Sequence, residues 1–213
     1  MNQKGMLLGA VICAIFIGTA CSKRISKDEL RELLMTDDIS VLTNLHSSII
    51  HTDDIVDLVR DTNETVSIMA MQYLGRRTEA DAVPILVSQL ANPSWRIRFF
   101  AVQSLGRFRD GTVEPDLLAL VQTEEYWQVQ RELSIALVLT RPTNNIAELE
   151  ERYRNSDGRI KACLGVALYF VGTNSESRSQ YFENIKYDES GDIRRLVNGM
   201  ITEIEVRRNE SSF

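Results

Sequence analysis

The apolar residues of this chain recur with one layout in five segments, at residues 65–77, 96–108, 128–140, 159–171 and 192–204. Each segment starts from a β-branched anchor residue, and these anchors are Val66, Ile97, Val129, Ile160 and Ile193. Consecutive anchors are 31, 32, 31 and 33 residues apart. Further apolar residues follow four and eight positions after each anchor, as on one face of an α-helix. The pattern predicts a tandem repeat in which each copy begins with a helix.

A second, shorter apolar helix is predicted after each of the first four segments, at residues 82–90, 113–121, 146–153 and 179–185. We expect their buried positions to be Leu86, Leu117, Leu149 and Phe182. Glycine or proline marks the expected end of each first helix, at Gly75, Gly106, Pro142 and Gly172. A left-handed residue or a missing N–H would end the helix there. Pro84 and Pro115 fall in first turns, where proline is tolerated.

The chain before these copies predicts a degenerate first pair and a leading helix. Residues 39–49 and 55–61 have the helical pattern without the clean spacing, as terminal repeats often do. Ser26 and Glu29 form a capping-box pattern ahead of Leu30, Leu33 and Leu34. One helix pair cannot bury its apolar face alone, so we expect the pairs to stack. The predicted fold class is all-α, an α-solenoid of about five helix pairs.

The most regular copies resemble a known repeat family. Trp95-Arg96-Ile97-Arg98, Ala101-Val102 and Leu105-Gly106, with a period near 31, resemble HEAT-like repeats of the short bacterial type. The resemblance covers roughly residues 36–206 and is strongest from 65 to 121. It implies a protein that works through its surface, and we expect the second helices to line a groove for a partner's helix or extended segment.

The N-terminal segment resembles the signal peptide of bacterial lipoproteins. After Lys4, residues 6–20 carry no charge, and about 15 helical residues span only about 22 Å, short of the roughly 30 Å of a bilayer core. Gly18, Thr19 and Ala20 precede Cys21 as in a lipobox, which implies that Cys21 becomes the lipidated first residue. Gly18 departs from the family, which usually has Leu there. A retained anchor and a plain signal peptide are the alternatives.

These features divide the chain into four parts. Residues 1–20 are predicted to be the signal peptide, 21–25 the lipidated cysteine and a short tether, 26–208 the repeats and 209–213 a C-terminal tail. Ser22 follows the cysteine, and in the Gram-negative lipoprotein family a residue other than Asp implies sorting to the outer membrane. We therefore expect a lipid anchor, with palmitate or other acyl chains, at the periplasmic face of the outer membrane.

The charge balance limits the partners that the body can bind. With 30 acidic and 24 basic residues, the formal charge is −6, which repels nucleic acid and anionic lipid. Cys163 is the only cysteine of the body, so a processed chain has no internal disulfide, and we expect Cys163 to be a small buried hydrophobe. His46 and His51 lie about 140° apart on a helix and cannot share a metal.

Six residues are candidates for binding a protein partner. Trp95 and Trp127 stand at corresponding places, two residues before their anchors, where exposed aromatics would form a binding hot spot. A polar residue follows the anchor in four copies, at Arg98, Gln130, Lys161 and Arg194. The structural alternative is that the tryptophans close the gap between repeats and that the polar residues pair with carboxylates or helix ends of the next repeat.

The sequence contains no motif of a known catalytic, nucleotide or metal site. We therefore expect no cofactor, no metal and no small-molecule substrate. The leading hypothesis is a non-enzymatic, membrane-tethered scaffold or adaptor that binds another protein in the bacterial envelope. One alternative is an enzyme, because HEAT-like repeats also occur in lyases that attach bilins to light-harvesting proteins. The other is a purely structural envelope lipoprotein.

Overall fold

The computed structural model describes residues 25–36, 50–140, 146–172, 178–181, 183 and 190–209. All regular secondary structure in these ranges is helical, which confirms the predicted all-α class. The described part contains no helix with the length and apolar composition needed to cross a bilayer. Several predictions made above concern positions outside the described residues: the signal peptide, Cys21, the helix at 39–49, His46, Pro142, Phe182 and the end of the tail after Asn209.

The chain separates into two compact units, Met1–Tyr73 and Leu74–Phe213, and the boundary falls within helix α5 (Glu64–Arg77). In the first unit, α2 (Lys27–Leu34) packs on α4 (Thr52–Leu58). The capping box is confirmed, because Ser26 Oγ accepts from the Glu29 N–H and Glu29 Oε2 accepts from the Ser26 N–H at 2.9 Å. The sequence therefore positions the start of the leading helix.

Two ion pairs connect residues of the first unit that are 30 positions apart. Lys27 Nζ lies 2.7 Å from Asp57 Oδ2, and Arg31 Nε lies 2.6 Å from Asp61 Oδ2. The hydrogen bond from Arg31 holds the pKa of the Asp61 carboxyl below its ordinary value. A spacing of about one repeat thus brings opposite charges together between α2 and residues of α4 or just after it.

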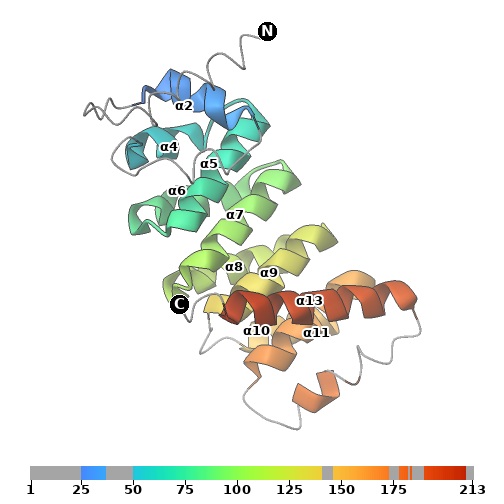
Figure 1. Ribbon diagram of the computed structural model, residues 1–213. Coiled ribbons are helices and arrows are strands. Elements are labelled where there is room, and N and C mark those ends of the chain that lie inside the picture. Colours follow the sequence, from blue (N-terminus) through green and yellow to red (C-terminus); the bar gives the residue numbers. More distant parts are fainter. Residues whose placement is uncertain are drawn as a thin grey trace. The chain divides into compact units, whose positions relative to one another are not determined.

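The second unit alternates long and short helices. The long first helices are α7 (Trp95–Phe108), α9 (Trp127–Thr140) and α11 (Gly158–Val171). The shorter second helices are α6 (Val83–Ser88), α8 (Glu114–Thr123) and α10 (Ile146–Arg154), with 3₁₀ turns at Ala80–Ala82, Gln89–Ala91 and Gly111–Val113. The first helices lie side by side, α7 against α9 and α9 against α11 (Figure 1).

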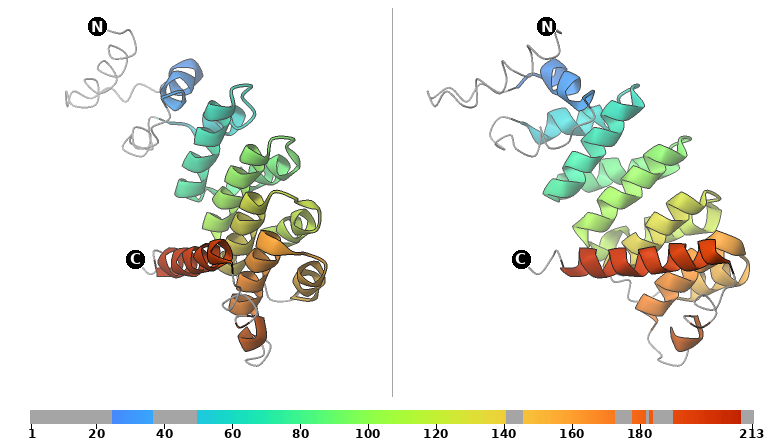
Figure 2. Two further views of the ribbon diagram at one scale, coloured as in Figure 1. Left: turned by 90° about the vertical axis from the view of Figure 1, so that its right-hand side faces the viewer. Right: turned by 45° about the vertical axis from the view of Figure 1, so that its right-hand side comes forward.

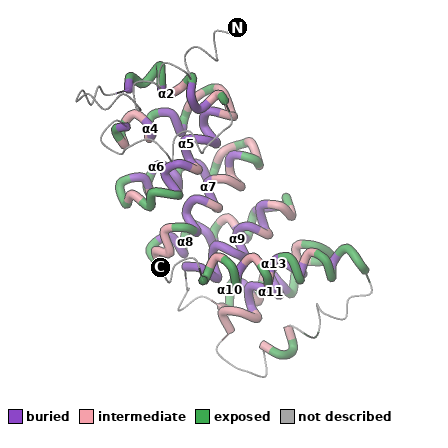
Figure 3. The backbone as a smooth tube through the Cα atoms, viewed as in Figure 1, coloured by how far each residue is buried: buried purple, intermediate pink, exposed green. Residues whose placement is uncertain are grey.

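The anchors and the second-helix leucines that the structure describes are buried, with one exception. The anchors Ile97 and Val129 are buried, and Leu86, Leu117 and Leu149 are buried in their second helices. Buried residues run along the facing sides of α7, α9 and α11 (Figure 3). Ile160 is wrong as a buried anchor, because it is only partly covered; the core of α11 starts at Ala162. Pro84 and Pro115 occupy first turns as predicted.

Gly75 and Gly106 do not end their helices, which corrects the sequence prediction. Both lie inside α5 and α7, and the residues with left-handed backbone are Thr78 (φ 51°) and Arg109 (φ 53°), each three positions later. The two glycines serve packing instead. A Cβ on Gly75 would stand 2.8 Å from the Ser104 backbone, and one on Gly106 would stand 3.0 Å from Ala136 Cβ. Glycine therefore allows the ends of consecutive first helices to approach closely.

The last helix, α13 (Gly191–Asn209), packs on more than its neighbour in sequence. The predicted fifth first helix, residues 192–204, falls inside it, but α13 contacts both α11 and α9. One core cluster joins the three helices, with Ile193, Val197 and Met200 of α13 against Val138 of α9 and Cys163 of α11. Figure 2 shows α13 on the side of α9 and α11 that faces away from α8 and α10. Helix α13 therefore covers one side of α9 and α11.

Candidate functional site

Arg98, one of the predicted binding residues, lies in the first turn of α7, and its side chain reaches the turn between α8 and α9. Its Nε and Nη2 donate to the two carboxylate oxygens of Glu124 at 2.7 and 2.9 Å, a bidentate geometry. Its Nη1 also donates to the backbone oxygens of Asn92 and Pro93, at 2.8 and 3.1 Å. Arg98 therefore holds the loop before its own helix to the end of the next second helix.

Glu124 is the centre of this arrangement, and its side chain is 1% exposed. Besides Arg98, its carboxylate accepts from the backbone N–H groups of Glu125 and Tyr126, at 3.1 and 2.9 Å. Its backbone oxygen accepts from Gln130 Nε2 at 3.1 Å and from Arg152 Nη2 at 3.2 Å. A buried carboxylate with four donors is well satisfied, so this corner is rigid.

The aromatic residues near this corner partly cover it. Trp95 stacks on Tyr126 with ring centroids 5.8 Å apart, and the Arg98 guanidinium lies 5.7 Å from the same Tyr126 ring. Tyr126 remains 49% exposed. We call Trp95, Arg98, Glu124, Tyr126 and Gln130 the junction cluster. Its outer surface combines an aromatic ring and a cation, the residue types of protein-binding hot spots.

The other predicted binding residues are dispersed rather than gathered in one site. Trp127 faces the Arg159 guanidinium, 5.0 Å from its ring centroid, and Lys161 lies 5.1 Å from the Tyr153 ring. Gln130 is fully buried and donates to the Val121 backbone oxygen at 2.8 Å. Arg194 is exposed on α13. Their role in binding stays a prediction. Arg98 binds the Glu124 carboxylate, as in the structural alternative, whereas Gln130 binds the end of the preceding second helix rather than a group of the next repeat.

A second group of charges joins α13 to α9. Arg207 donates to Glu132 at 2.6 Å and to Glu203 one turn earlier in α13, and Arg131 also pairs with Glu203. Glu132 has a fully buried side chain, and this burial raises the pKa of its carboxyl despite the arginines. Burial also raises the pKa of Glu203, but Arg131 and Arg207 lower it further, so the net shift is downward. These four residues form the α13 ion cluster.

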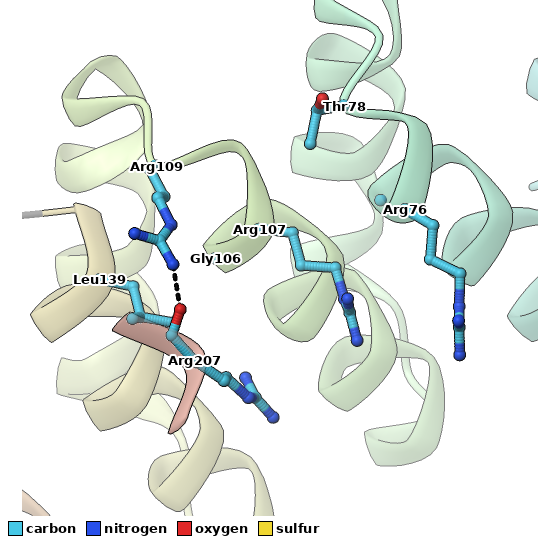
Figure 4. Close-up of a pocket in the computed structure, with 8 residues that line it drawn as sticks. Arg76, Thr78, Gly106, Arg107, Arg109, Leu139 and Arg207 are labelled. Carbon is cyan, nitrogen blue, oxygen red and sulfur yellow. Dashed lines mark hydrogen bonds between the residues drawn. The ribbon is translucent and has the colours of Figure 1, made fainter. Parts of the chain in front are cut away.

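The ends of the first helices surround a pocket of about 200 Å³. Its lining consists of Gly75, Arg76, Thr78, Gly106, Arg107, Arg109, Leu139 and Arg207. We call this the arginine pocket. Figure 4 shows the side chains of Arg76 and Arg107 extending in parallel, while Arg109 reaches to the backbone oxygen of Arg207. The lining carries four cations and no carboxylate, although the chain has a net charge of −6.

Of the residues that line the arginine pocket, Gly75 and Gly106 were predicted as helix ends, and the four arginines had no predicted role. Leu74-Gly75-Arg76 and Leu105-Gly106-Arg107 are equivalent triplets, and their arginines occupy equivalent places on two neighbouring helices. That spacing could have indicated a pair of cations. The contribution of Arg207 had no signal, because it depends on where α13 crosses. Glu132 carries no motif either.

No group of three or more His, Cys, Asp or Glu residues is arranged to hold a metal in the described part of the chain. Cys163 is buried as predicted, and desolvation raises the pKa of its thiol to about 12, so it is an unreactive core residue at neutral pH. His51 stands at the N-cap position of α4, makes no side-chain capping hydrogen bond there and is exposed.

Comparison with known proteins agrees with this architecture. Residues 52–138 match the family model described as HEAT repeats. The fold is similar to a structure of the complex of CpcE and CpcF of phycocyanin lyase from Nostoc sp. PCC7120, at 18% identity and a TM-score of 0.59, over 89% of this chain and 80% of that one. It is also similar to an engineered protein, at 14% identity and a TM-score of 0.54, over 97% and 98% of the two chains. No curated protein matches the sequence.

The match over residues 52–138, the 31-residue spacing and the paired helices define the class: the chain has an all-α helical-repeat fold, an α-solenoid, that is similar to HEAT repeats. HEAT repeats generally mediate protein interactions. The structural likenesses, at these identities, concern the fold alone.

Proposed function

We propose that this protein is a membrane-tethered, non-enzymatic scaffold or adaptor that binds another protein through its repeat surface in the bacterial envelope. One observation supports binding of a protein partner: the helix ends of successive repeats meet and form two surface features. These features are the junction cluster, with its exposed Tyr126, and the arginine pocket. Both features are built from rigid helix ends, which suits recognition of a partner at low entropic cost.

The tethering part of the proposal rests on residues 15–24. The uncharged segment, the small residues 18–20 and Cys21 support cleavage and lipidation at Cys21, and Ser22 supports sorting to the outer membrane. The capping box at Ser26 begins helix α2 only about four residues after the anchor, so the repeats would lie within about 14 Å of the attachment point. The partner would therefore be another envelope protein at the periplasmic face.

Photo-crosslinking tests the adaptor proposal directly. A photoreactive phenylalanine replaces Tyr126 in the full chain, expressed in a Gram-negative host, and the same residue replaces the exposed Glu151 of α10 as a control. An adaptor gives one dominant adduct of stoichiometric yield from position 126 and much less from position 151. A smear of weak adducts of equal intensity from both positions would instead favour a purely structural envelope component.

Metabolic labelling tests the anchor separately. Cells are grown with a clickable palmitate analogue, and the labelled chain is compared with Cys21→Ser. Lipidation at Cys21 predicts a labelled wild-type chain in the outer-membrane fraction and no label in the variant. Label that persists in Cys21→Ser would refute attachment at this residue, and Cys13→Ser serves as the matched control.

A bilin lyase-like enzyme is the second candidate, because the fold is similar to that of a phycocyanin lyase complex over 89% of this chain. Absorbance titration of the full chain with a free bilin tests it. A saturable spectral shift at equimolar bilin would place this candidate first, whereas an unchanged spectrum leaves the adaptor as the leading proposal.

A further inference from the structure

The arginine pocket concentrates positive charge on a protein that is otherwise acidic. Four arginines line it, and two of them, Arg76 of α5 and Arg107 of α7, are exposed residues. An arginine in the last turn of a helix complements the negative end of the helix dipole, which accounts for one arginine at each helix end. It does not account for Arg207, which comes from α13, or for Arg109, which lies beyond the end of α7.

The spacing of the two equivalent arginines is set by packing. Gly75 rests against Ser104 and Gly106 against Ala136, so the first helices approach closely at the ends that bear Arg76 and Arg107. Packed helices lie about 8–10 Å apart. A peptide in polyproline II conformation covers about the same distance in three residues, at about 3.1 Å each, and its three residues per turn place every third side chain on the same face. Carboxylates at every third position of such a segment would therefore meet successive arginines.

The third cation of this row is positioned by the fold rather than by the repeat. In the copy after Arg107, the equivalent residue is Leu139, which gives the pocket an apolar wall. Arg207 enters beside it from α13, and Glu132 and Glu203 hold its side chain. Those two carboxylates position the Arg207 side chain beside the other three arginines of the lining. Arg109 is itself fixed through the Arg207 backbone oxygen.

We propose that the arginine pocket binds an acidic segment of the protein partner in polyproline II conformation, through carboxylates spaced three residues apart. The inference rests on the proposed adaptor function and names its site and its ligand chemistry. A pocket of about 200 Å³ holds a few residues of a chain. A long polyanion or an anionic bilayer must also approach the remaining surface of a protein with charge −6, and this surface repels it.

Fluorescence anisotropy with the full chain in a zwitterionic detergent tests the proposal. The probe is a fluorescein-labelled peptide of about ten residues with Glu at every third position among Gly, Ser and Ala, and the comparison probe has the same composition with contiguous Glu residues. The pocket variant is Arg76→Gln/Arg107→Gln. The matched control, Arg60→Gln/Arg96→Gln, removes two other exposed arginines and changes the net charge equally. Circular dichroism verifies that both variants are folded.

We expect the spaced peptide to bind about tenfold more tightly than its isomer, and the pocket variant to lose about tenfold of this affinity while the control loses less than about twofold. Raising the salt from about 20 to about 200 mM weakens binding to the wild-type chain. Equal binding of the spaced peptide to the pocket variant and the control overturns the proposal. The proposal is also overturned if the peptide does not bind and the chain instead binds phosphatidylglycerol vesicles in a way that requires Arg76 and Arg107.

The crosslinking experiment separates this inference from the proposed function. If the dominant adduct from position 126 forms equally well in Arg76→Gln/Arg107→Gln, the adaptor function stands and the pocket proposal fails. If the spaced peptide binds as expected but no dominant adduct forms, the pocket proposal stands and the adaptor function fails.

Discussion

Glu124 and Glu132 are buried carboxylates eight residues apart, and each holds an arginine. Glu124 pairs with Arg98, 26 residues earlier, and also accepts two backbone N–H groups of its own loop. Glu132 pairs with Arg207, 75 residues later, and its only other close cation is Arg131, 3.7 Å away, among the described residues. The first carboxylate closes a junction between adjacent repeats. The second fastens the last helix across α9.

The difference shows two ways in which a helical repeat uses a buried charge. The junction at Glu124 is local, and four donors replace the water that its carboxylate loses. At Glu132, burial still raises the pKa of the carboxyl, so Arg207 does not fully offset the loss of water. We infer that the Glu132 contact serves to position α13, and with it Arg207 at the arginine pocket, more than to stabilise the fold.

The largest expected effect is that of removing the Glu132 carboxylate alone. Glu132→Ala leaves the Arg207 charge largely buried without its main partner, and we expect the free energy of unfolding to fall by about 3–5 kcal/mol in urea titrations. The double variant Glu132→Leu/Arg207→Met removes both charges and is expected to stay within about 1 kcal/mol of wild type. A double variant as unstable as Glu132→Ala would show that the pair itself stabilises the protein.

Truncating the local junction is expected to cost somewhat less. Glu124→Ala leaves Arg98 and two loop N–H groups without their acceptor, but Arg98 keeps its bonds to the Asn92 and Pro93 oxygens. We expect a loss of about 2–3 kcal/mol in the free energy of unfolding, measured by the same urea titration. Glu125→Ala, at the exposed neighbouring position, is the control and should change stability by less than about 0.5 kcal/mol.

A glycine-to-alanine substitution should have opposite effects on stability at Gly75, where two first helices pack closely, and at Gly199, on the open face of α13. Gly75→Ala places a Cβ 2.8 Å from the Ser104 backbone, so we expect a loss of about 1–2 kcal/mol in thermal or urea unfolding. Gly199→Ala lies inside α13 with nothing within 4 Å of its Cβ, and should stabilise the protein by about 0.5–1 kcal/mol. Stabilisation by both substitutions would contradict the close approach of the first helices.

The smallest effect is the pH dependence, and its sign differs between two carboxyls. The pKa of Glu132 is raised, so the folded chain binds its proton more readily than the unfolded chain. The stability of wild type relative to Glu132→Gln should therefore rise as the pH falls through the raised pKa towards the ordinary value near 4.5. Melting temperatures of the two proteins across this range measure it.

Asp61 provides the opposite case, because the hydrogen bond from Arg31 lowers its pKa. Wild type should be more stable than Asp61→Asn above the ordinary value of 3.8, and this advantage should disappear as the pH falls through the lowered pKa. An advantage of equal size at all pH values would mean that the charge of Asp61 contributes nothing and that only its shape matters.

Features with local causes were predictable from the sequence alone. The capping box at Ser26, the prolines in first turns and the buried columns of the second helices depend on neighbours within one or two turns, where spacing decides which side chains share a face. The burial of Cys163 followed from its apolar neighbours in the same way. The period of about 31 residues was sufficient to determine the all-α repeat class.

Other features depended on contacts between distant segments. Gly75 and Gly106 were read as helix ends, but whether glycine ends a helix or admits a neighbouring one depends on what packs against it. The arginine pocket requires α13 to cross α9, so that Arg207 reaches helix ends about a hundred residues earlier in the chain. The sequence by itself determined the helices, their period and their buried faces, because these follow from local spacing. Only the tertiary structure decided which helix ends meet, because packing across distant residues obeys no fixed spacing.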